Sequence, residues 1–456
     1  MKTDVLLESV AALVKAKPQL VFALPFWLMR GRAALKSEVA RRVDLDVALL
    51  PYDANVLKEL GHQRSEGRRL VLATAADSRL AQRVADHLGI FDDVMASDGV
   101  RNLRGETKAQ ALVERFGEGR FDYMGEDRHD VPVWKRSAAA HVVGNASLAA
   151  QMARPGRKVH FIERERRGAS AIVKELRAYQ WAKNLLVFVP LITAHAIASG
   201  TLLTELLAFV AFSLTASTVY LLNDLADLED DRRHPFKRSR PLASGDLHIG
   251  TALALLPLLL FGAGAIAMRL PWSFGALLSL YLVTNLAYSL GLKRVALLDV
   301  FVLAALYTMR ILAGAAAIDV PVSHWLLAFS LFAFLSLALV KRFVEVSNVA
   351  SREEARVGGR GYLAGDGQLL AMLGTACGCL AVLVFALYIT SPQVVVLYRA
   401  PAMLWFAVPL LLYWMSRIWF LAHRGVLHED PLLFALHDPP SYATGLLILA
   451  AMLAAT

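Results

Sequence analysis

Acidic side chains recur at helical spacing in residues 223–245, directly behind an apolar run. The block reads NDLADLEDDRRHPFKRSRPLASG and places Asp224, Asp227 and Asp231 at positions i, i+3 and i+7. If the preceding helix continues past Tyr220, the three carboxylates share one face. Such groups repel one another unless a cation lies among them, and Mg²⁺ takes a few carboxylates and completes its shell with water and phosphate oxygens. The spacing therefore predicts a magnesium site.

Basic residues follow the aspartates at once. Guanidinium and ammonium groups suit phosphate oxygens that a metal leaves free, so the candidates for phosphate binding in this block are Asn223, Arg232, Lys237, Arg238 and Arg240. Metal and arginines together would stabilise a departing diphosphate. The alternative interpretation of the block alone is a solvated loop whose charges cancel and which sets membrane topology.

A second polar cluster lies between two later apolar runs. Tyr288, Lys293, Arg294 and Asp299 lie where the runs meet, and Arg310 lies in the middle of the second run. An ionisable residue at membrane depth needs a partner or a wet cavity, which makes Arg310 a candidate site residue. The alternative is an arginine that a structural carboxylate neutralises.

Apolar helices must position these residues. The 456 residues are 56% hydrophobic, and from about residue 184 the chain is a series of runs long enough to cross a bilayer. We count nine candidate spans, centred near Ile192, Phe212, Leu258, Ser279, Leu306, Phe332, Leu380, Pro409 and Ile448. Nearly all basic residues of the connections fall on one side of such a bundle, and only Arg269 and Arg399 fall on the other. This asymmetry predicts a multi-pass protein of the cytoplasmic membrane, with the Asp-rich block and the N-terminal region in the cytoplasm.

Composition argues against several other classes. The net charge of +9 suits basic cytoplasmic loops as well as nucleic acid, and we find no nucleic-acid motif. Cys377 and Cys379 lie in an apolar run and offer neither a disulfide framework nor a four-ligand zinc site. A transporter with Arg310 on a permeation path is the alternative from another class. The acids gather on one side, however, and no inverted hydropathy repeat is evident.

Residues 69–163 have a different pattern. The β-rich runs RRLVLATA, DDVMAS, FDYMGE, AAHVVGN and KVHFIE alternate with helical stretches, which predicts an open α/β fold with a parallel sheet. Sites of such sheets lie at strand ends, where the chain has Thr74, Lys108, Glu126, Asp127 and Asp130. The alternative is an α/β domain whose strand-end acids are incidental.

The two membrane clusters resemble the UbiA superfamily of intramembrane prenyltransferases. The resemblance rests on Asn-Asp-x-x-Asp-x-x-x-Asp-Arg and on Tyr-Ser-x-x-Leu-Lys-Arg with a later Asp, and it covers about residues 173–456. It implies a nine-helix bundle around a central cavity. There Mg²⁺ would bridge the Asp-rich motifs, Asp299 included, to a diphosphate, and an isoprenoid chain would reach the lipid through a side opening.

One departure points to a branch of that superfamily. Many of its aromatic prenyltransferases carry a second aspartate four residues after the first, whereas Asp299 is followed by VFVLAAL. With LRAYQWAKNLLVFVP and KRFVE, the pattern most resembles the branch that transfers 5-phosphoribose from phosphoribosyl diphosphate to a polyprenyl (decaprenyl-type) phosphate. The resemblance implies these further phosphate ligands: Lys183, Tyr288, Lys293, Arg294, Arg310, Lys341 and Arg342. The alternative within the same fold is prenyl transfer to an aromatic or quinoid acceptor.

Residues 1–150 resemble the haloacid dehalogenase (HAD) superfamily of phosphatases. Thr74, Lys108 and the acids 126–130 match its second, third and fourth motifs, with Glu126 in place of the usual Asp. The resemblance implies that they hold a phosphoryl group and Mg²⁺. The first motif, with its aspartate nucleophile, is not present, because MKTDVLLES resembles what normally follows it.

Loss of that motif would remove a central strand and leave two unpaired sheet edges. Either the start lies upstream, or the domain is non-catalytic and serves as a regulatory or interaction module. With the nucleophile restored, we expect the domain to remove the 5-phosphate from the phosphoribosyl lipid. We therefore divide the chain into a HAD-like cytosolic domain (1–150), a basic linker and interfacial segment (151–183), and a UbiA-type transferase domain (184–456).

Overall fold

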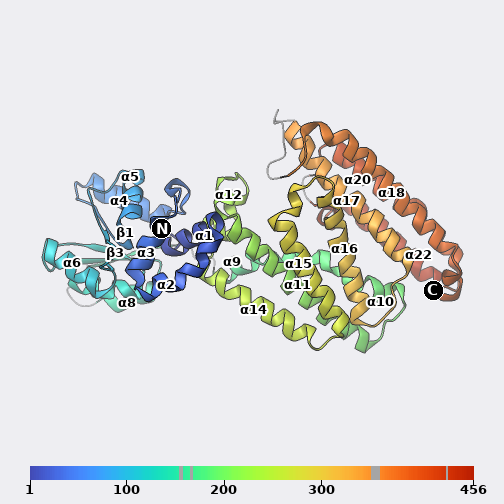
Figure 1. Cartoon of the computed structure of the whole chain (residues 1–456), viewed down its shortest axis with the longest axis horizontal. Helices are drawn as coiled ribbons and strands as arrows, with labels where there is room; N and C mark the ends of the chain where they lie inside the picture. The colour runs from blue at the N-terminus through green and yellow to red at the C-terminus, as the bar shows by residue number, and fades with distance from the viewer. Residues whose placement is uncertain (154–157, 165–167, 351–359, 428–429) are drawn as a thin grey trace. The chain divides into compact units, whose positions relative to one another are not determined.

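The structure is a computed structural model that describes residues 1–153, 158–164, 168–350, 360–427 and 430–456. It divides into two compact units, shown with their labelled elements in Figure 1. Unit 1 comprises Met1–Leu176 with Leu221–Leu256, and unit 2 comprises Arg177–Tyr220 with Pro257–Thr456. Each unit has hydrophobic clusters of its own.

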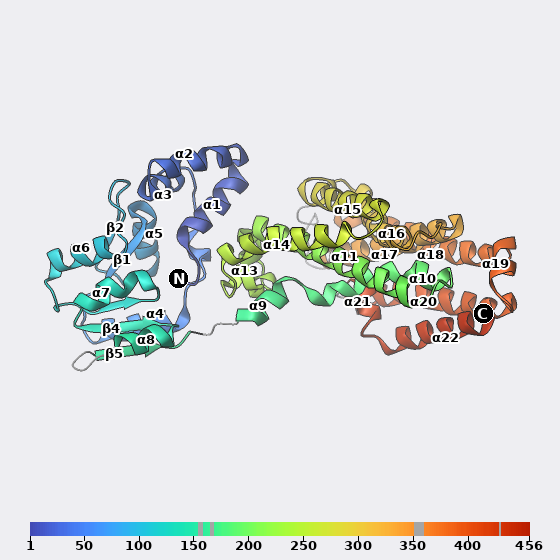
Figure 2. The ribbon, with the colours of Figure 1, turned by 90° about the horizontal axis from the view of Figure 1, so that it is seen from below.

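Parallel strands form the sheet part of unit 1. They are β1 (Val71–Asp77), β2 (Asp93–Ser97), β3 (Tyr123–Gly125), β4 (Ala139–Val143) and β5 (Lys158–Ile162). The accompanying helices are α4 (Ala54–Ser65), α5 (Ser78–Leu88), α6 (Glu106–Phe116), α7 (Val131–Arg136) and α8 (Ala146–Met152). Figure 2 shows α8 beside β4 and β5. The predicted parallel α/β pattern is confirmed, strand for strand.

The strands make two sheets rather than one. β1 pairs with β2, and β3, β4 and β5 pair in that order. No ladder joins β1 to β3 among the residues that the structure describes. Residues of β1 and β3 instead line one cavity of about 760 Å³. The interruption lies where the sequence leads us to expect a missing central strand, while the HAD-like nature of the domain stays a prediction.

Local signals explain where these helices begin and end. Asp77 caps α5 by accepting a hydrogen bond from the Arg79 N–H, and Gly89 ends the helix with a φ of 62°. A side-chain cap satisfies one of the free N–H groups of the first turn, and glycine takes the left-handed conformation without a Cβ clash.

The first 40 residues form a helical hairpin with a small core. Its elements are α1 (Val5–Ala16), the 3₁₀ turn η1 (Pro18–Ala23), α2 (Leu24–Met29) and α3 (Arg32–Ala40). Leu13, Trp27, Leu35 and Val39 are buried against one another.

The Asp-rich block belongs to unit 1 and does not continue as one helix. α11 (Ser199–Ala226) ends before Asp227, and α12 (Leu228–Arg233) begins after it. η5 (Lys237–Ser239), α13 (Pro241–Ser244) and the linker helix α9 (Gly168–Glu175) complete this part of the unit. The expectation that the helix continues past Tyr220 is therefore confirmed for six further residues, up to Ala226.

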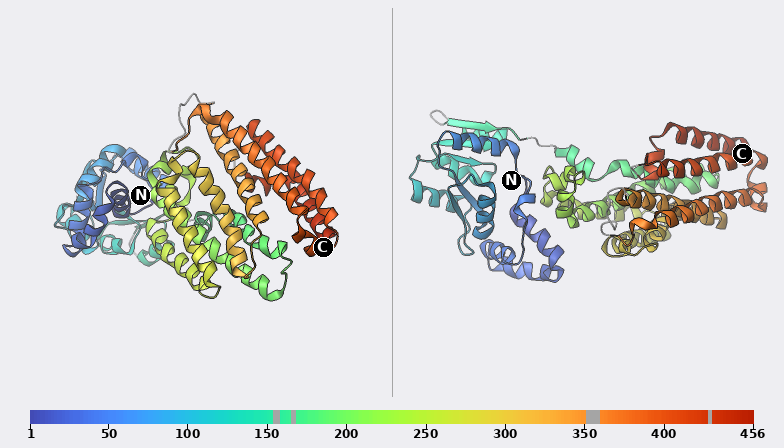
Figure 3. Two further views of the ribbon diagram at one scale, coloured as in Figure 1. Left: turned by 45° about the vertical axis from the view of Figure 1, so that its right-hand side comes forward. Right: turned by 90° about the horizontal axis from the view of Figure 1, so that it is seen from above.

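Among the described residues, seven helices are long and apolar enough to cross a membrane: Ser199–Ala226 (α11), Ile249–Ala267 (α14), Trp272–Leu290 (α15), Leu298–Ala317 (α16), His324–Ala350 (α17), Ala364–Ile389 (with α18) and Pro401–His423 (with α20). The long helices of unit 2 lie side by side in Figure 3. Of the nine predicted spans, the first falls on η4 (Ala178–Phe188) and α10 (Val189–Thr193), and the ninth on α22 (Pro439–Ala455). These two stay predictions. The remaining short elements are η6 (Leu292–Arg294), α19 (Pro392–Leu397), η8 (Pro401–Phe406) and α21 (Pro431–Ala435).

Small residues allow close approach within the bundle. A Cβ at Gly314 would lie 1.9 Å from the Val187 carbonyl oxygen, and one at Gly374 would lie 2.0 Å from the Trp419 ring. Glycine at such crossings lets backbones and bulky rings meet. The Gly314 contact brings η4 against α16, the helix that carries Arg310.

Candidate functional site

Two carboxylates of the Asp-rich block converge on one cation. Arg240 Nη1 donates to Asp224 Oδ1 at 2.9 Å and to Asp231 Oδ2 at 2.5 Å. Both aspartates are buried, whereas Arg240 is partly exposed. A partly exposed guanidinium thus lies between the two carboxylates, and both carboxylates are oriented toward one positive charge.

Asp227 is not brought to the same point. The helix is interrupted at this residue, with φ −99° and ψ 14°, and its side chain forms no hydrogen bond or ion pair with the residues that the structure describes. Among those residues no group of three or more His, Cys, Asp or Glu side chains is close enough to hold a metal. The structure therefore brings two of the three predicted ligands together.

Burial raises the pKa of Asp231, and Arg240 opposes that rise. A carboxyl in this position gains more from a cation than an exposed one does, because its charged form is poorly solvated. The local chemistry suits a divalent cation held by carboxylate oxygens.

The basic residues of the block separate into different roles. Arg232 forms a two-pronged pair with buried Glu8 of α1, at 3.0 and 2.7 Å. Lys237 Nζ lies 3.8 Å from Asp231, and Arg238 is exposed. Arg240 and Lys237 therefore lie beside the carboxylates, and Arg232 is held by another partner.

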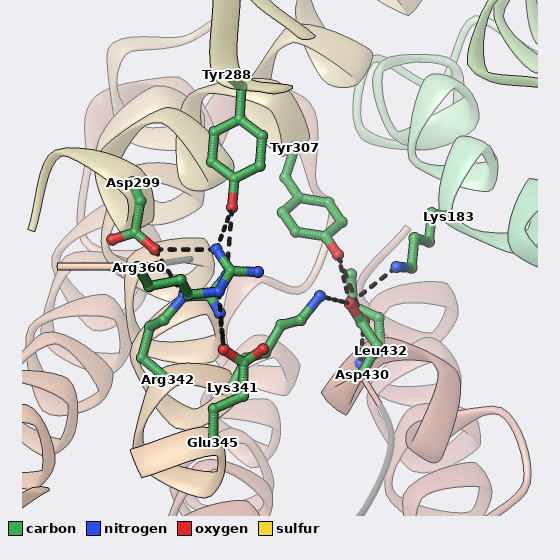
Figure 4. Close-up of polar contacts among 10 residues, drawn as sticks. All are labelled: Lys183, Tyr288, Asp299, Tyr307, Lys341, Arg342, Glu345, Arg360, Asp430 and Leu432. Atoms are coloured by element: carbon green, nitrogen blue, oxygen red, sulfur yellow. Dashed lines mark hydrogen bonds and ion pairs between the residues drawn. The ribbon is translucent and has the colours of Figure 1, made fainter. Parts of the chain in front are cut away.

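A second site lies in unit 2 around Asp430, as Figure 4 shows. Lys183 Nζ lies 2.8 Å and Lys341 Nζ 3.5 Å from Asp430 Oδ2. The Tyr307 hydroxyl donates to the same oxygen at 3.2 Å. Burial alone would raise the pKa of Asp430, but Lys183 and Lys341 hold it below its usual range.

Arg310 is buried beside this cluster without a carboxylate partner among the described residues. Its Nε donates to Asn184 Oδ1 and its Nη2 to the Tyr281 hydroxyl, both at 2.9 Å. Its guanidinium also lies 5.2 Å from the centre of the Tyr307 ring, and Lys183 Nζ lies 5.9 Å from the same centre. The alternative of a neutralised arginine is therefore not what the structure has. Among the described residues, neutral groups and aromatic faces hold Arg310 in place, and no carboxylate forms an ion pair with it.

Asp299 takes part in a separate network, also drawn in Figure 4. Arg342 Nε lies 2.7 Å and Arg360 Nη1 3.7 Å from Asp299 Oδ2, and Tyr362 donates to its other oxygen. Tyr288 accepts hydrogen bonds from both arginines. Asp299 and Arg342, predicted to hold metal and phosphate, are thus paired with each other.

The remaining predicted ligands lie near the helix ends. Lys293 is half-buried and Arg294 exposed, both in η6 between α15 and α16. Asn223 is half-buried near the end of α11.

The strand-end residues of unit 1 partly converge. Lys108 Nζ donates to Asp130 Oδ1 at 3.3 Å, and Asp130 Oδ2 accepts from the backbone N–H groups of Glu126 and Asp127. A Cβ at Gly125 would lie 2.6 Å from Asp130 Oδ2, so glycine is required there. Thr74, Glu126 and Asp130 line the 760 Å³ cavity between the two sheets.

Sequence reasoning missed Asp430, Glu8, Asn184 and Tyr281. Asp430 carried one readable signal: it precedes Pro431 and caps α21 by accepting from the Leu432 N–H. Asp before Pro is a typical helix start. The other residues become significant only through partners that are distant in sequence, such as Arg232 and Arg310.

The family follows from comparison with known proteins. The model of the UbiA prenyltransferase family matches residues 187–438, which contain the Asp-rich block and all of the Asp430 cluster except Lys183. The chain belongs to the UbiA prenyltransferase family, is a transferase, and is a multi-pass membrane protein.

The chain is similar in sequence to three relatives from bacteria. The chain is 39% identical over 466 residues to the uncharacterized protein y4nM of Sinorhizobium fredii, covering all of this chain and 89% of that protein. It is 36% identical over 269 residues to the nodulation protein NoeC of Azorhizobium caulinodans, covering 58% of this chain and 86% of that one. It is 36% identical over 195 residues to the decaprenyl-phosphate phosphoribosyltransferase of Mycolicibacterium smegmatis, covering 41% of this chain and 60% of that one.

Proposed function

We propose that the protein is a Mg²⁺-dependent enzyme that transfers 5-phosphoribose from phosphoribosyl diphosphate to a polyprenyl phosphate at the cytoplasmic face of the membrane. The observation that carries the proposal is the pair Asp224 and Asp231, which meet on Arg240 with hydrogen bonds of 2.9 and 2.5 Å. The likeness to decaprenyl-phosphate phosphoribosyltransferases supports the choice of substrates.

The donor's diphosphate fits the Asp-rich block. Asp224 and Asp231, with Asp227 between them in sequence, would hold Mg²⁺, which when bound neutralises the leaving diphosphate. Arg240 and Lys237 would then turn from the carboxylates to the phosphate oxygens, because a guanidinium fork suits phosphate as well as carboxylate. The sugar carbon left behind develops positive charge as the diphosphate departs.

An anionic acceptor fits the cluster in unit 2. Lys183, Lys341 and Arg310 supply three cations, and among the described residues the carboxylate that pairs with the two lysines is that of Asp430. Excess positive charge in a buried setting favours a ligand that brings negative charge, such as a phosphate. An uncharged aromatic acceptor would leave that charge uncompensated.

The isoprenoid chain has an apolar cavity available in unit 2. The cavity has a volume of about 460 Å³, and its lining includes Pro190, Trp325, Phe329, Phe385 and Leu411. Aliphatic and aromatic walls of this kind suit the hydrocarbon part of a lipid substrate.

A donor assay tests the proposal. Membranes containing the protein are incubated with Mg²⁺ and either labelled phosphoribosyl diphosphate plus polyprenyl phosphate, or labelled prenyl diphosphate plus an aromatic acid. We expect a lipid-soluble labelled product only from the first pair, and none when the metal is chelated. Product from the second pair alone would establish prenyl transfer to an aromatic acceptor instead.

For unit 1 we propose a phosphatase-like domain that removes the phosphomonoester of the same product when an Asp-x-Asp-Gly-Thr segment supplies the nucleophile. The meeting of Lys108 and Asp130 beside a cavity that Thr74 also lines supports this proposal. Incubating the phosphoribosyl lipid with the chain extended at its N-terminus by that segment, and with the chain lacking it, and measuring released phosphate tests it. No release by the extended chain, with the lipid left intact, would favour a regulatory or interaction role for the domain.

A further inference from the structure

The helical hairpin at the start of the chain exposes an unusual set of large apolar side chains. Phe22 is 85% exposed, Met29 86% and Phe26 61%, and Leu28 and Val21 are exposed as well. They lie on η1 and α2, within the apolar segment Pro18–Met29. Single exposed apolar residues are ordinary, but a contiguous set marks a surface that meets another apolar phase.

The hairpin is not simply an unfolded or badly packed segment. Its inward side has its own core of Leu13, Trp27, Leu35 and Val39, and Arg42 lies 4.7 Å over the Trp27 ring. The exposed residues are those of the opposite side. The hairpin therefore has one apolar side that packs into its own core and one that is exposed.

Basic residues surround the exposed side. Lys15 and Lys17 precede it and Arg30 and Arg32 follow it, and residues 9–37 contain no aspartate or glutamate. Within the described part of the chain, no ion pair involves Lys17, Arg30 or Arg32. Exposed aromatic and aliphatic groups with a rim of cations are the composition of segments that lie in the interface of a bilayer with anionic lipids.

The hairpin is anchored close to membrane-spanning helices. Lys15, just before η1, lies 2.7 Å from Asp230, and Glu8 pairs with Arg232. Both partners belong to the connection between α11 and α14, two of the spans. These contacts lie within unit 1, which also contains the ends of those helices at Leu221–Ala226 and Ile249–Leu256. In Figure 2, α1 and α2 project away from the strands.

We propose that residues 18–29 of the hairpin dock onto the membrane. Phe22, Phe26 and Met29 insert into the acyl boundary of the same bilayer that the bundle crosses. Lys17, Arg30 and Arg32 contact anionic headgroups. The hairpin thereby gives unit 1 a second attachment to the membrane, besides its helices. The proposal is independent of which substrates the transferase uses.

Depth-dependent quenching tests the proposal on the full chain. In a background with Cys377→Ala and Cys379→Ala, single cysteines replace Phe22, Met29 or, as matched control, Val100, which is 93% exposed on another loop of unit 1. Each protein is labelled with an environment-sensitive fluorophore and reconstituted into phosphatidylcholine and phosphatidylglycerol vesicles. We expect blue-shifted emission at positions 22 and 29 that acyl-chain spin labels quench and iodide does not. Position 100 should show the opposite behaviour.

Quenching of positions 22 and 29 by iodide would overturn the proposal. Protection from both quenchers would overturn it too, because the surface would then be covered by protein, either another part of this chain or a second copy. A second arm reverses the basic rim with Lys17→Glu and Arg30→Glu, with Lys58→Glu and Arg79→Glu as control. The rim variant should lose blue shift and lipid quenching as phosphatidylglycerol is added, relative to the control. Equal behaviour of the two variants would remove the electrostatic part of the proposal.

Discussion

At the scale of single residues, the arginine of each cluster is held by different partners. Arg240 of unit 1 is bound to Asp224 and Asp231, whereas Arg310 of unit 2 is held by neutral side chains among the described residues. The first arrangement suits the exchange of one cation for another, and the second suits the capture of an anion. The proposed transfer would use both.

Replacing Asp224 with Asn should lower turnover by at least about 100-fold. The proposed metal would lose a carboxylate ligand, and the leaving diphosphate would then be less stabilised. The amide keeps the side-chain shape and can still accept from Arg240, so the protein should stay folded. Steady-state rates with saturating donor, together with the thermal unfolding temperature, measure the two effects. Glu229→Gln is the control, since Glu229 contacts Arg233 on the exposed side. An Asp224→Asn protein as active as the control would rule out the metal assignment.

Replacing Lys183 with Met should raise the KM for polyprenyl phosphate, because the proposed acceptor site loses one of its cations. In Lys183→Arg the positive charge stays, so the KM should change less. Initial rates at varied polyprenyl phosphate measure both variants, and an unchanged KM in Lys183→Met would contradict this role.

At the scale of elements, α1 and the Asp-rich block form one piece. Glu8 and Arg232 are both buried and paired, Arg232 Nε also donates to the Ala243 carbonyl, and Lys2 pairs with Asp246. The segment that carries the candidate metal ligands is therefore held by the N-terminal hairpin. In the structure, Arg232 therefore holds α1 against the Asp-rich block, and the predicted phosphate contact of Arg232 stays a prediction.

Glu8→Gln should destabilise unit 1 by about 3–5 kcal/mol, because it leaves a buried guanidinium without its counter-charge. The double variant Glu8→Gln/Arg232→Met should recover most of that loss, since the charge is then absent. Unfolding followed by the fluorescence of the tryptophans measures stability, and donor turnover is measured in parallel. A double variant that regains stability but has no activity would restore Arg232 as a phosphate ligand.

The sequence predicted the elements better than the contacts between them. Alternating β-rich and helical runs located all five strands of unit 1, and hydropathy located the seven long spans. The Asp-rich face was predicted from an unbroken helix, and the interruption at Asp227 takes that residue out of line with Asp224 and Asp231. Asp299 was assigned to a metal, but Arg342, which lies 43 positions later, reaches it first. Residue spacing predicts which side chains share a face of one helix. It does not predict which side chain from a distant part of the sequence will form an ion pair with them.

At the scale of the whole molecule, we expect more crossings than the seven spans found among the described residues. The basic connections predict that the N-terminal region and the Asp-rich block at the end of α11 lie on the same side of the membrane. On that prediction, the segment before α11 must cross outward. η4 and α10 have a combined length of about 30 Å, which matches the hydrocarbon thickness of a bilayer. We expect this broken segment to act as the first span.

The 17 residues of α22 reach about 25 Å, close to the lower limit for a span. If α22 also crosses, the total is nine, and the two chain ends lie on opposite sides. Epitope tags at each end, probed in intact and permeabilised cells, measure this. We expect the N-terminal tag to be protected and the C-terminal tag to be accessible from outside. Two protected tags would place α22 along the membrane surface.

The bridge that Arg240 forms between Asp224 and Asp231 has a kinetic consequence. An internal cation already balances these acids, so a free metal ion must compete with it, and the resting enzyme should retain magnesium weakly. A donor that binds together with its metal brings phosphate oxygens. These oxygens can accept the hydrogen bonds of Arg240 when the carboxylates turn to the metal. On the proposed function, we therefore expect the metal and the diphosphate donor to bind together as one complex. At a fixed donor concentration, initial rates should then follow the concentration of that complex rather than that of free magnesium.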